Sequence, residues 1–122
     1  MKPTVLRAAA GAPFPTRERC EIREMLNDDA WPGVSLAQAR VAPGVTTELH
    51  ALGVAEAYVI THGAGRVEIG GDWHPVAAGD AVLIPVGAPQ RIQNTATEDL
   101  VFLCLCTPRF APEAYRGLEE VP

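Results

Sequence analysis

One histidine and two nearby glutamates are the clearest candidates for chemistry in this chain. Glu48 lies two residues before His50, and Glu56 lies six residues after it. One imidazole and two carboxylates suit a divalent first-row metal such as Mn, Fe, Ni or Zn. A histidine next to a glutamate on a strand is also a common hydrogen-bonded pair. The residues alone therefore leave both interpretations open.

Strands must position these side chains, because alternate residues of a strand face the same side. This alternation places Glu48, His50 and Leu52 on one face, and it places Glu56 and Tyr58 together on the next strand. If both faces point into a barrel, the histidine and both glutamates converge. Either glutamate is then a candidate catalytic base. The Tyr58 phenol either donates a hydrogen bond into the pocket or packs with its hydroxyl at the rim.

The spacing of turn residues predicts the fold class. Eleven glycines and eleven prolines are spread along the chain and separate short β-rich segments. Gly70 and Gly71 lie between two alternating runs and predict a hairpin. Seven or eight short strands joined by tight turns are typical of an all-β sandwich or barrel. A helix is expected only at residues 111–120, where a proline lies near the start.

Length and composition limit the classes of function. The 122 residues contain no long polar linker, which favours one domain. A net charge of −5 without a basic run argues against a nucleic-acid partner. No apolar run approaches the roughly 20 residues of a membrane span. Three cysteines, an odd number, and an N-terminus without an apolar leader lead us to expect a cytoplasmic protein.

Two spaced patterns in the chain resemble those of the cupin superfamily. The pattern G-x5-H-x-H-x3/4-E-x6-G is matched at residues 44–63, with Leu52 at the second histidine. The pattern G-x5-P-x-G-x2-H-x3-N is matched at residues 79–94, with Gln90 at the histidine. Both departures fall on positions that bind metal in cupins. The resemblance implies a single cupin domain over residues 1–122.

That domain is implied to be a double-stranded β-helix, or jelly-roll (RmlC-like) barrel, with a metal site of three histidines and one glutamate in its mouth. Carried over by position, His50, Glu56 and Gln90 are the ligand candidates. Leu52 cannot coordinate a metal, and Glu48 is the candidate to replace it. The Glu48-Leu49-His50 segment also loosely resembles the Gln-x-His pair of cupin-type mannose-6-phosphate isomerases. The alternative is a metal-free barrel in which Gln90 hydrogen-bonds to His50 or Glu56.

The expected function is that of a metal-assisted enzyme acting on a small polar metabolite, such as a sugar phosphate or a keto compound. Isomerase or epimerase, dioxygenase and cyclase chemistries all suit such a site. Gln38 and Arg40 would bind the substrate if they face inward, since an arginine fork suits carboxylate or phosphate; a solvated edge is an equal alternative. Leu52 would form an apolar wall. The alternative function is a metal-free barrel that binds or senses a small ligand without catalysis.

The cysteines and the two other histidines are expected to have structural rather than chemical roles. Cys104 and Cys106 lie in an apolar run and are expected to be small core residues rather than thiolate ligands. His62 and His74 are expected at the rim or surface. A homodimer is expected, because cupins commonly pair through N-terminal strands and residues 20–26 form an alternating edge candidate.

Overall fold

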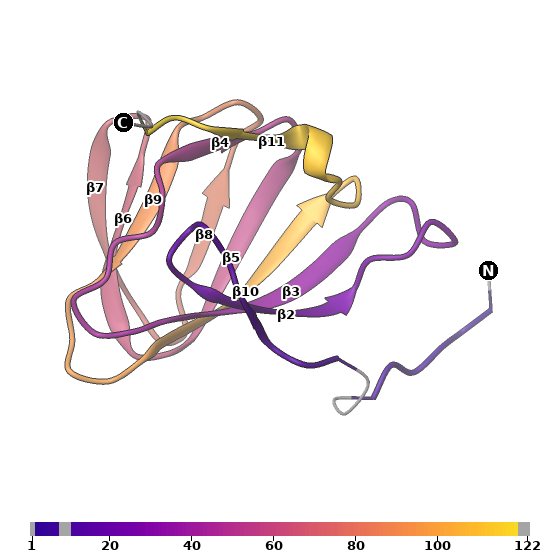
Figure 1. Cartoon of the computed structure of the whole chain (residues 1–122), viewed down its shortest axis with the longest axis horizontal. Coiled ribbons are helices and arrows are strands. Elements are labelled where there is room, and N and C mark those ends of the chain that lie inside the picture. Colours follow the sequence, from indigo (N-terminus) through magenta and orange to yellow (C-terminus); the bar gives the residue numbers. More distant parts are fainter. Residues whose placement is uncertain (1, 8–10, 120–122) are drawn as a thin grey trace.

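The computed structural model describes residues 2–7 and 11–119, which form two antiparallel sheets packed face to face (Figure 1). The larger sheet contains, in spatial order, β1 (Phe14–Pro15), β2 (Glu21–Leu26), β3 (Ser35–Val41), β10 (Leu100–Thr107), β5 (Ala55–His62) and β8 (Ala81–Ile84). The smaller sheet contains β11 (Tyr115–Gly117), β4 (His50–Leu52), β9 (Gln90–Asn94), β6 (Ala64–Ile69) and β7 (Asp72–Ala77). The predicted all-β jelly-roll barrel is confirmed.

Alternating burial explains why these segments form strands. On β5, Tyr58 and Ile60 are buried and Val59 between them is exposed. On β9, every second residue from Gln90 to Asn94 is fully buried. This alternation is expected of a strand that has one face packed on the core and the other exposed to solvent, because successive side chains point to opposite faces. The apolar residues of both inner faces meet as the core.

Two motif positions stabilise the turns that hold the sheets together. The Asn94 side chain donates to the carbonyl oxygens of Val41 (2.9 Å) and Glu98 (2.7 Å), and so ties β9 to β3 and to the loop before β10. Gly63 has φ +84°, and a Cβ there would lie 2.7 Å from the carbonyl oxygen of Asp99. The predicted hairpin between β6 and β7 is also present, with positive φ at both of its central glycines.

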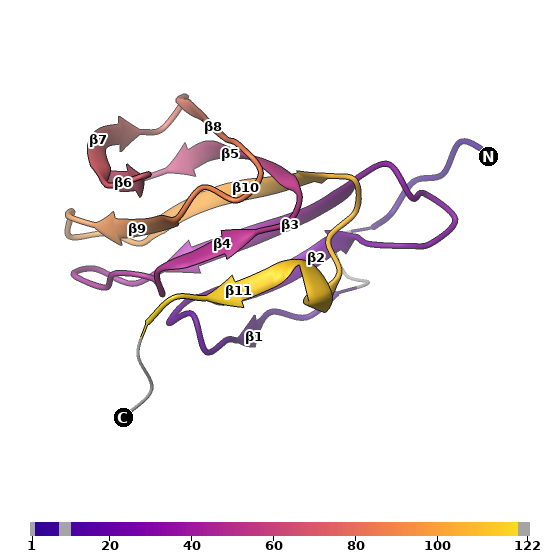
Figure 2. The same ribbon diagram turned by 90° about the horizontal axis from the view of Figure 1, so that it is seen from above.

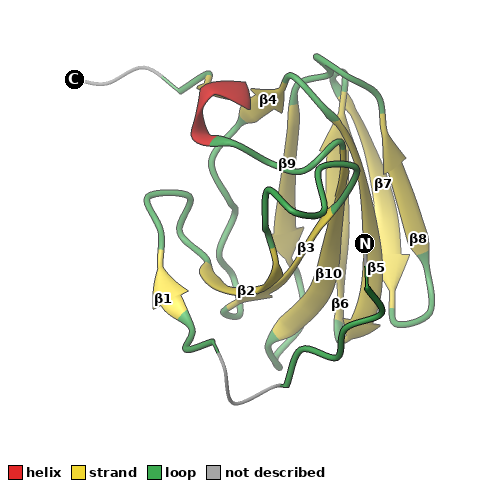
Figure 3. Cartoon of the chain, turned by 90° about the vertical axis from the view of Figure 1, so that its right-hand side faces the viewer, coloured by secondary structure: helices red, strands yellow, loops and turns green. Residues whose placement is uncertain are grey.

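The C-terminal segment is a strand rather than the expected helix. Pro112–Ala114 form a short 3₁₀ turn, and β11 then pairs with β4 (Figures 2 and 3). The helix expected over residues 111–120 is therefore wrong for residues 111–119; the last of these positions lies outside the described residues. The reason is the unpaired edge of β4, whose backbone groups need a partner. No helix within the described ranges is long and apolar enough to cross a membrane.

Gly65→Ala tests the close approach of β6 and β9 within the smaller sheet. Gly65 is buried on β6, and a Cβ there would overlap the carbonyl oxygen of Gln93 on β9. We expect the variant to lose about 2–4 kcal/mol of unfolding free energy in urea denaturation, because the β6–β9 ladder must separate. Gly33→Ala is the control, since its Cβ would meet nothing within 4 Å. Equal stability of the two variants would contradict this packing.

Candidate functional site

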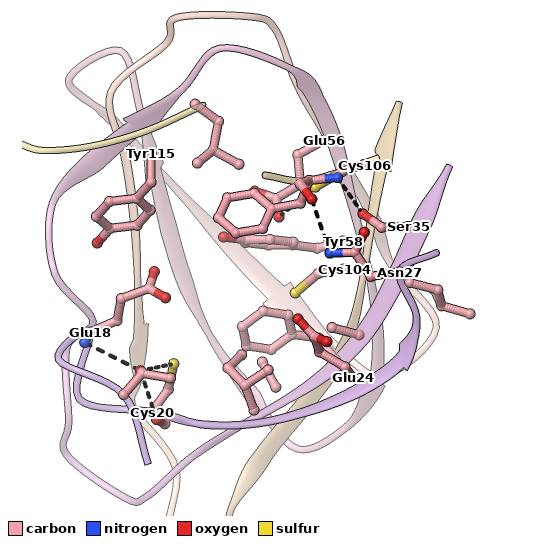
Figure 4. A pocket seen from close by; sticks show the side chains of 18 of the residues that line it. Glu18, Cys20, Glu24, Asn27, Ser35, Glu56, Tyr58, Cys104, Cys106 and Tyr115 are labelled. Carbon is pink, nitrogen blue, oxygen red and sulfur yellow. Dashed lines mark hydrogen bonds between the residues drawn. The ribbon is translucent and has the colours of Figure 1, made fainter. Parts of the chain in front are cut away.

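A cavity of about 260 Å³ opens between the two sheets (Figure 4). Strands β2, β3, β5 and β10 form one side of it, and residues of β4, β9 and β11 form the other. Most of the wall is apolar, with Phe102 and Ile92 at its base. The polar groups gather in two places, one around Glu56 and one around His50. Each group is built by a different set of strands.

Glu56 forms the first group. It lies on β5 directly across from Cys106 on β10, whose Sγ is 3.6 Å from Glu56 Oε2. Its other oxygen, Oε1, is covered and has no hydrogen-bond partner among the described residues. Burial raises the pKa of Glu56 to about 7, against the smaller opposing effect of the Gln90 amide. At neutral pH this carboxyl is therefore present in both its protonated and its ionised form.

Gln90 lies behind this carboxyl and is completely buried. Its Oε1 accepts a hydrogen bond of 2.7 Å from the Tyr58 hydroxyl. Its Nε2 has no hydrogen-bond partner among the described residues. Tyr58 is buried as well, packs on Phe102 with ring centroids 4.5 Å apart, and has a pKa raised by burial. Its hydroxyl therefore stays protonated and keeps donating to Gln90, rather than lying at the rim.

His50 forms the second group. Its Nδ1 lies 2.7 Å from the carbonyl oxygen of Glu48. Because a carbonyl only accepts, Nδ1 carries the hydrogen and the neutral ring has its lone pair on Nε2. Nε2 is 3.7 Å from Glu18 Oε1. The Tyr115 ring stacks on the imidazole, with centroids 4.9 Å apart, and fixes its plane.

Glu18 is a site residue that the sequence analysis missed. It lies in the loop between β1 and β2, where residues 16–19 look like an ordinary charged surface turn. Its carboxyl lines the cavity, and burial raises its pKa while the neighbouring His50 lowers it. Its backbone oxygen accepts from the Glu48 amide, which fixes the loop against the approach to β4. This is a contact between distant segments, so no local pattern could have shown it.

Glu48 does not share the cavity with His50, contrary to expectation. Strand β4 begins only at His50, and the segment before it breaks the alternation, so that Thr47 rather than Glu48 lines the cavity. The Glu48 carboxylate accepts instead from the Tyr115 hydroxyl and pairs with Arg17 at 3.2 Å. It therefore holds the stacked tyrosine in place.

Gln38 and Arg40 also face away from the cavity, so the expectation of inward-facing substrate ligands fails. On β3 the odd-numbered residues Ala37 and Ala39 line the cavity, and alternation turns the even-numbered polar residues to the outer face. Arg40 pairs there with Asp99 at 3.0 Å. Leu52 does line the cavity, on β4.

The cysteines lie closer to the site than expected. Cys104 and Cys106 pack against the core, but both also line the cavity, as does Cys20. Burial raises the pKa of Cys20 to about 11 and that of Cys106 to about 12, and it also raises that of Cys104. All three are therefore neutral thiols at physiological pH and poor nucleophiles or metal ligands. His62 and His74 are exposed, as expected.

The donor groups do not fit the metal site of the cupin pattern. Leu52 offers no donor atom, the Gln90 oxygen is occupied by Tyr58, and Glu48 is turned toward Tyr115. In the part of the chain that the structure describes, no three His, Cys, Asp or Glu side chains are placed to hold a metal ion. What remains is one imidazole and separate carboxyls, a set suited to proton transfer.

Glu56→Gln tests the burial of the acid. The pKa of Glu56 is raised from 4.5 to about 7 on folding, so the unfolded chain loses this proton at lower pH than the folded one. Wild-type stability should fall relative to the variant as the pH rises through this interval, and the difference should level off above it. We expect a total change on the order of 2 kcal/mol in urea denaturation, allowing for the partial exposure of the residue. A difference between wild type and Glu56→Gln that stays flat with pH would refute the burial.

Restoring the two missing histidines tests the metal argument. We expect the wild-type chain, purified without affinity metal, to contain far less than one transition-metal ion per chain by elemental analysis. The double variant Leu52→His/Gln90→His should gain a site for Zn or Ni, because imidazole binds late first-row ions well. Leu52→Asn/Gln90→Asn is the matched control. A stoichiometric metal in the wild-type protein would contradict the argument.

Comparisons with known protein families, sequences and solved structures agree with the observed fold. The family model described as "Cupin domain" matches residues 37–106. An uncharacterised protein of Methanocaldococcus jannaschii is 34% identical over 110 residues, 88% of each chain. The crystal structure of a predicted oxalate decarboxylase from Thermotoga maritima is 26% identical, with a TM-score of 0.77 over 86% of this chain and 99% of that one.

Two further solved structures show likeness of fold alone. The Streptomyces nucleoside dehydratase Pac13 has a TM-score of 0.82 at 12% identity, over 99% of this chain and 95% of that one. KdgF from Halomonas sp. has a TM-score of 0.79 at 14% identity, over 92% and 99%. The narrower resemblance to mannose-6-phosphate isomerases finds no support in these comparisons. The chain belongs to the cupin domain family.

Proposed function

We propose that this protein is an enzyme that transfers protons on a small molecule bound in the cavity, and that it does so without a metal ion. The observation that carries the proposal is Glu56, which lines the cavity, has one covered oxygen without a hydrogen-bond partner among the described residues, and has a pKa raised by burial to about 7. A group with a pKa near the working pH is the most effective general acid or base. A purely structural carboxyl would instead have a partner.

The His50–Glu18 pair supplies the complementary group. Nε2 of the neutral ring is the base; the Glu18 carboxyl lies 3.7 Å from this same nitrogen, and its negative charge favours the imidazolium that forms. Tyr115 keeps the ring in one plane by stacking. Figure 4 shows Glu18 and Tyr115 on one side of the cavity and Glu56 on the other. A substrate between them can lose a proton on one side and gain one on the other.

The reaction class that follows is isomerisation or elimination next to a carbonyl group. His50 Nε2 removes the proton from the carbon beside the carbonyl, and protonated Glu56 gives its proton to the carbonyl oxygen or to a departing hydroxyl. The products are an enol, or an unsaturated carbonyl compound and water. Both groups return to their starting states when His50 releases its proton and Glu56 regains one. No step needs an oxidant or reductant.

Enzymes occur among the proteins that share this fold, which supports a catalytic function but does not identify the reaction. Structures with this fold include a predicted oxalate decarboxylase and a nucleoside dehydratase, and the latter's name denotes an elimination. A barrel that merely binds a ligand would not require a carboxyl that titrates near neutral pH opposite a histidine base. The keto compounds expected from the sequence remain the substrate class that this chemistry suits.

Hydrogen–deuterium exchange tests the proposal. The protein is incubated in D₂O with a panel of small ketones and β-hydroxy ketones, and loss of the proton beside the carbonyl is followed by NMR. We expect catalysed exchange that survives a chelator and that falls at least about 100-fold in His50→Gln and in Glu56→Gln. Glu98→Gln should retain full activity. Exchange that a chelator abolishes, or that is unchanged in Glu56→Gln, would refute the proposal, and no exchange above buffer would favour the binding barrel.

A further inference from the structure

The charged residues that line the cavity are almost all acidic. Glu18, Glu24 and Glu56 contribute three carboxyl groups, and among the described lining residues no lysine or arginine is present. His50 is the one lining residue able to carry a positive charge, and it faces Glu18. Figure 4 shows the three carboxyl groups on different sides of the cavity. The field inside it is therefore negative whenever Glu24 or Glu18 is ionised.

Arg109 lies next to the cavity wall, where its Nε donates to Oδ1 of the lining residue Asn27 at 2.9 Å, but Arg109 itself does not line the cavity.

Two further arginines, in the loop before β2, are engaged elsewhere. Arg17 pairs with Glu48 at 3.2 Å and lies over the Tyr115 ring, 5.4 Å from its centroid. Arg19 pairs with Glu119 at 2.7 Å and donates to the carbonyl oxygen of Thr46. These cations hold the loop before β2 and the C-terminal segment together. They are not available to neutralise a ligand inside the cavity.

Glu24 stands apart from this network. It lies on β2, where the even-numbered residues face the cavity, and no ion pair to it is found among the described residues. A second observation points to a ligand: Glu56 lines the same cavity, and its covered Oε1 has no hydrogen-bond partner among the described residues. Apolar side chains such as Ile22, Phe102 and Phe110 fill the wall between the carboxyl groups.

We infer that the ligand of this cavity is a protonated amine with an apolar body, and that Glu24 is its counter-ion. The amine gives Glu24 a positive partner, which none of the described residues supplies, while the apolar body covers the aromatic wall. An anion would face carboxylates on several sides, and no lysine or arginine among the described lining residues would compensate its charge. The inference names the substrate class of the proposed enzyme and so rests on the proposed function; it also departs from the sugar phosphate expected from the sequence.

A charge series of small ligands tests the inference. The probes are 2-phenylethylamine, 2-phenylethanol and phenylacetate, which share a phenyl ring and a short arm and differ in charge. Binding to the full chain is measured by NMR titration at neutral pH. We expect the amine to bind at least about fivefold more tightly than the alcohol, and phenylacetate to show no measurable binding.

Two variants identify the residue responsible. Because Glu24 is exposed, Glu24→Gln should weaken amine binding only about twofold to fivefold and leave alcohol binding unchanged. Glu21→Gln is the matched control, because Glu21 lies on the same strand with its side chain on the opposite face and away from the cavity. Phenylacetate binding as tightly as the amine, or equal amine binding by the wild type and Glu24→Gln, would overturn the inference.

Binding and catalysis can fail separately in these experiments. If the amine binds as expected but no ketone or aminoketone undergoes proton exchange, the charge preference holds and the proposed function fails. If exchange occurs on anionic ketones as readily as on aminoketones, the proposed function holds and the inference is overturned.

Discussion

The carboxyl group of Glu56 is the constraint on which the site depends. It is held in the wall of a largely apolar cavity, and no lysine or arginine among the described residues lies there to stabilise its charge. An ionised group in such a place loses hydration free energy, so its proton is retained to higher pH. The pairing of β5 with β10 places it opposite Cys106, a neutral thiol that does little to relieve this cost. The proposed acid–base role of the site follows from this unrelieved burial.

The two positions where cupin histidines are missing have structural uses here. Leu52 contributes apolar wall, and Gln90 holds the Tyr58 hydroxyl in the layer behind Glu56. Leu52 has no metal donor atom, and the oxygen of Gln90 is engaged by Tyr58. The imidazole that remains, His50, is oriented by a backbone carbonyl and a stacked tyrosine, which are sufficient supports for a base. Fold and chemistry are therefore separate properties of this barrel.

The sequence could predict those parts of the structure that depend on local period and spacing. Alternation correctly places Glu56 and Tyr58 on the inner face of β5, and the glycine pair correctly marks the β6–β7 hairpin. Alternation fails before His50, because that segment is not a regular strand and the register shifts by one residue. Glu48 then leaves the cavity, and a residue from a distant loop, Glu18, takes its place near the histidine.

The C-terminal segment illustrates the same limit. Its proline and helix-forming residues favour a helix locally, but pairing with β4 satisfies more backbone groups and brings Tyr115 over His50. The pairing of β11 with β4 forms the second wall of the cavity, and it also places Tyr115 against the His50 ring. Neither is encoded in the spacing of nearby residues, so the sequence alone could predict the barrel and only half of the site.

The pKa of Glu56 is the quantity that tests this account most directly. It can be measured by following the side-chain carboxyl ¹³C resonance of the labelled protein as a function of pH, with Glu56→Gln used to assign the signal. The account predicts a midpoint at about 7. A midpoint near 4.5, the value of an ordinary glutamate, would show that the carboxyl is solvated or paired, and would contradict its role as an acid at neutral pH.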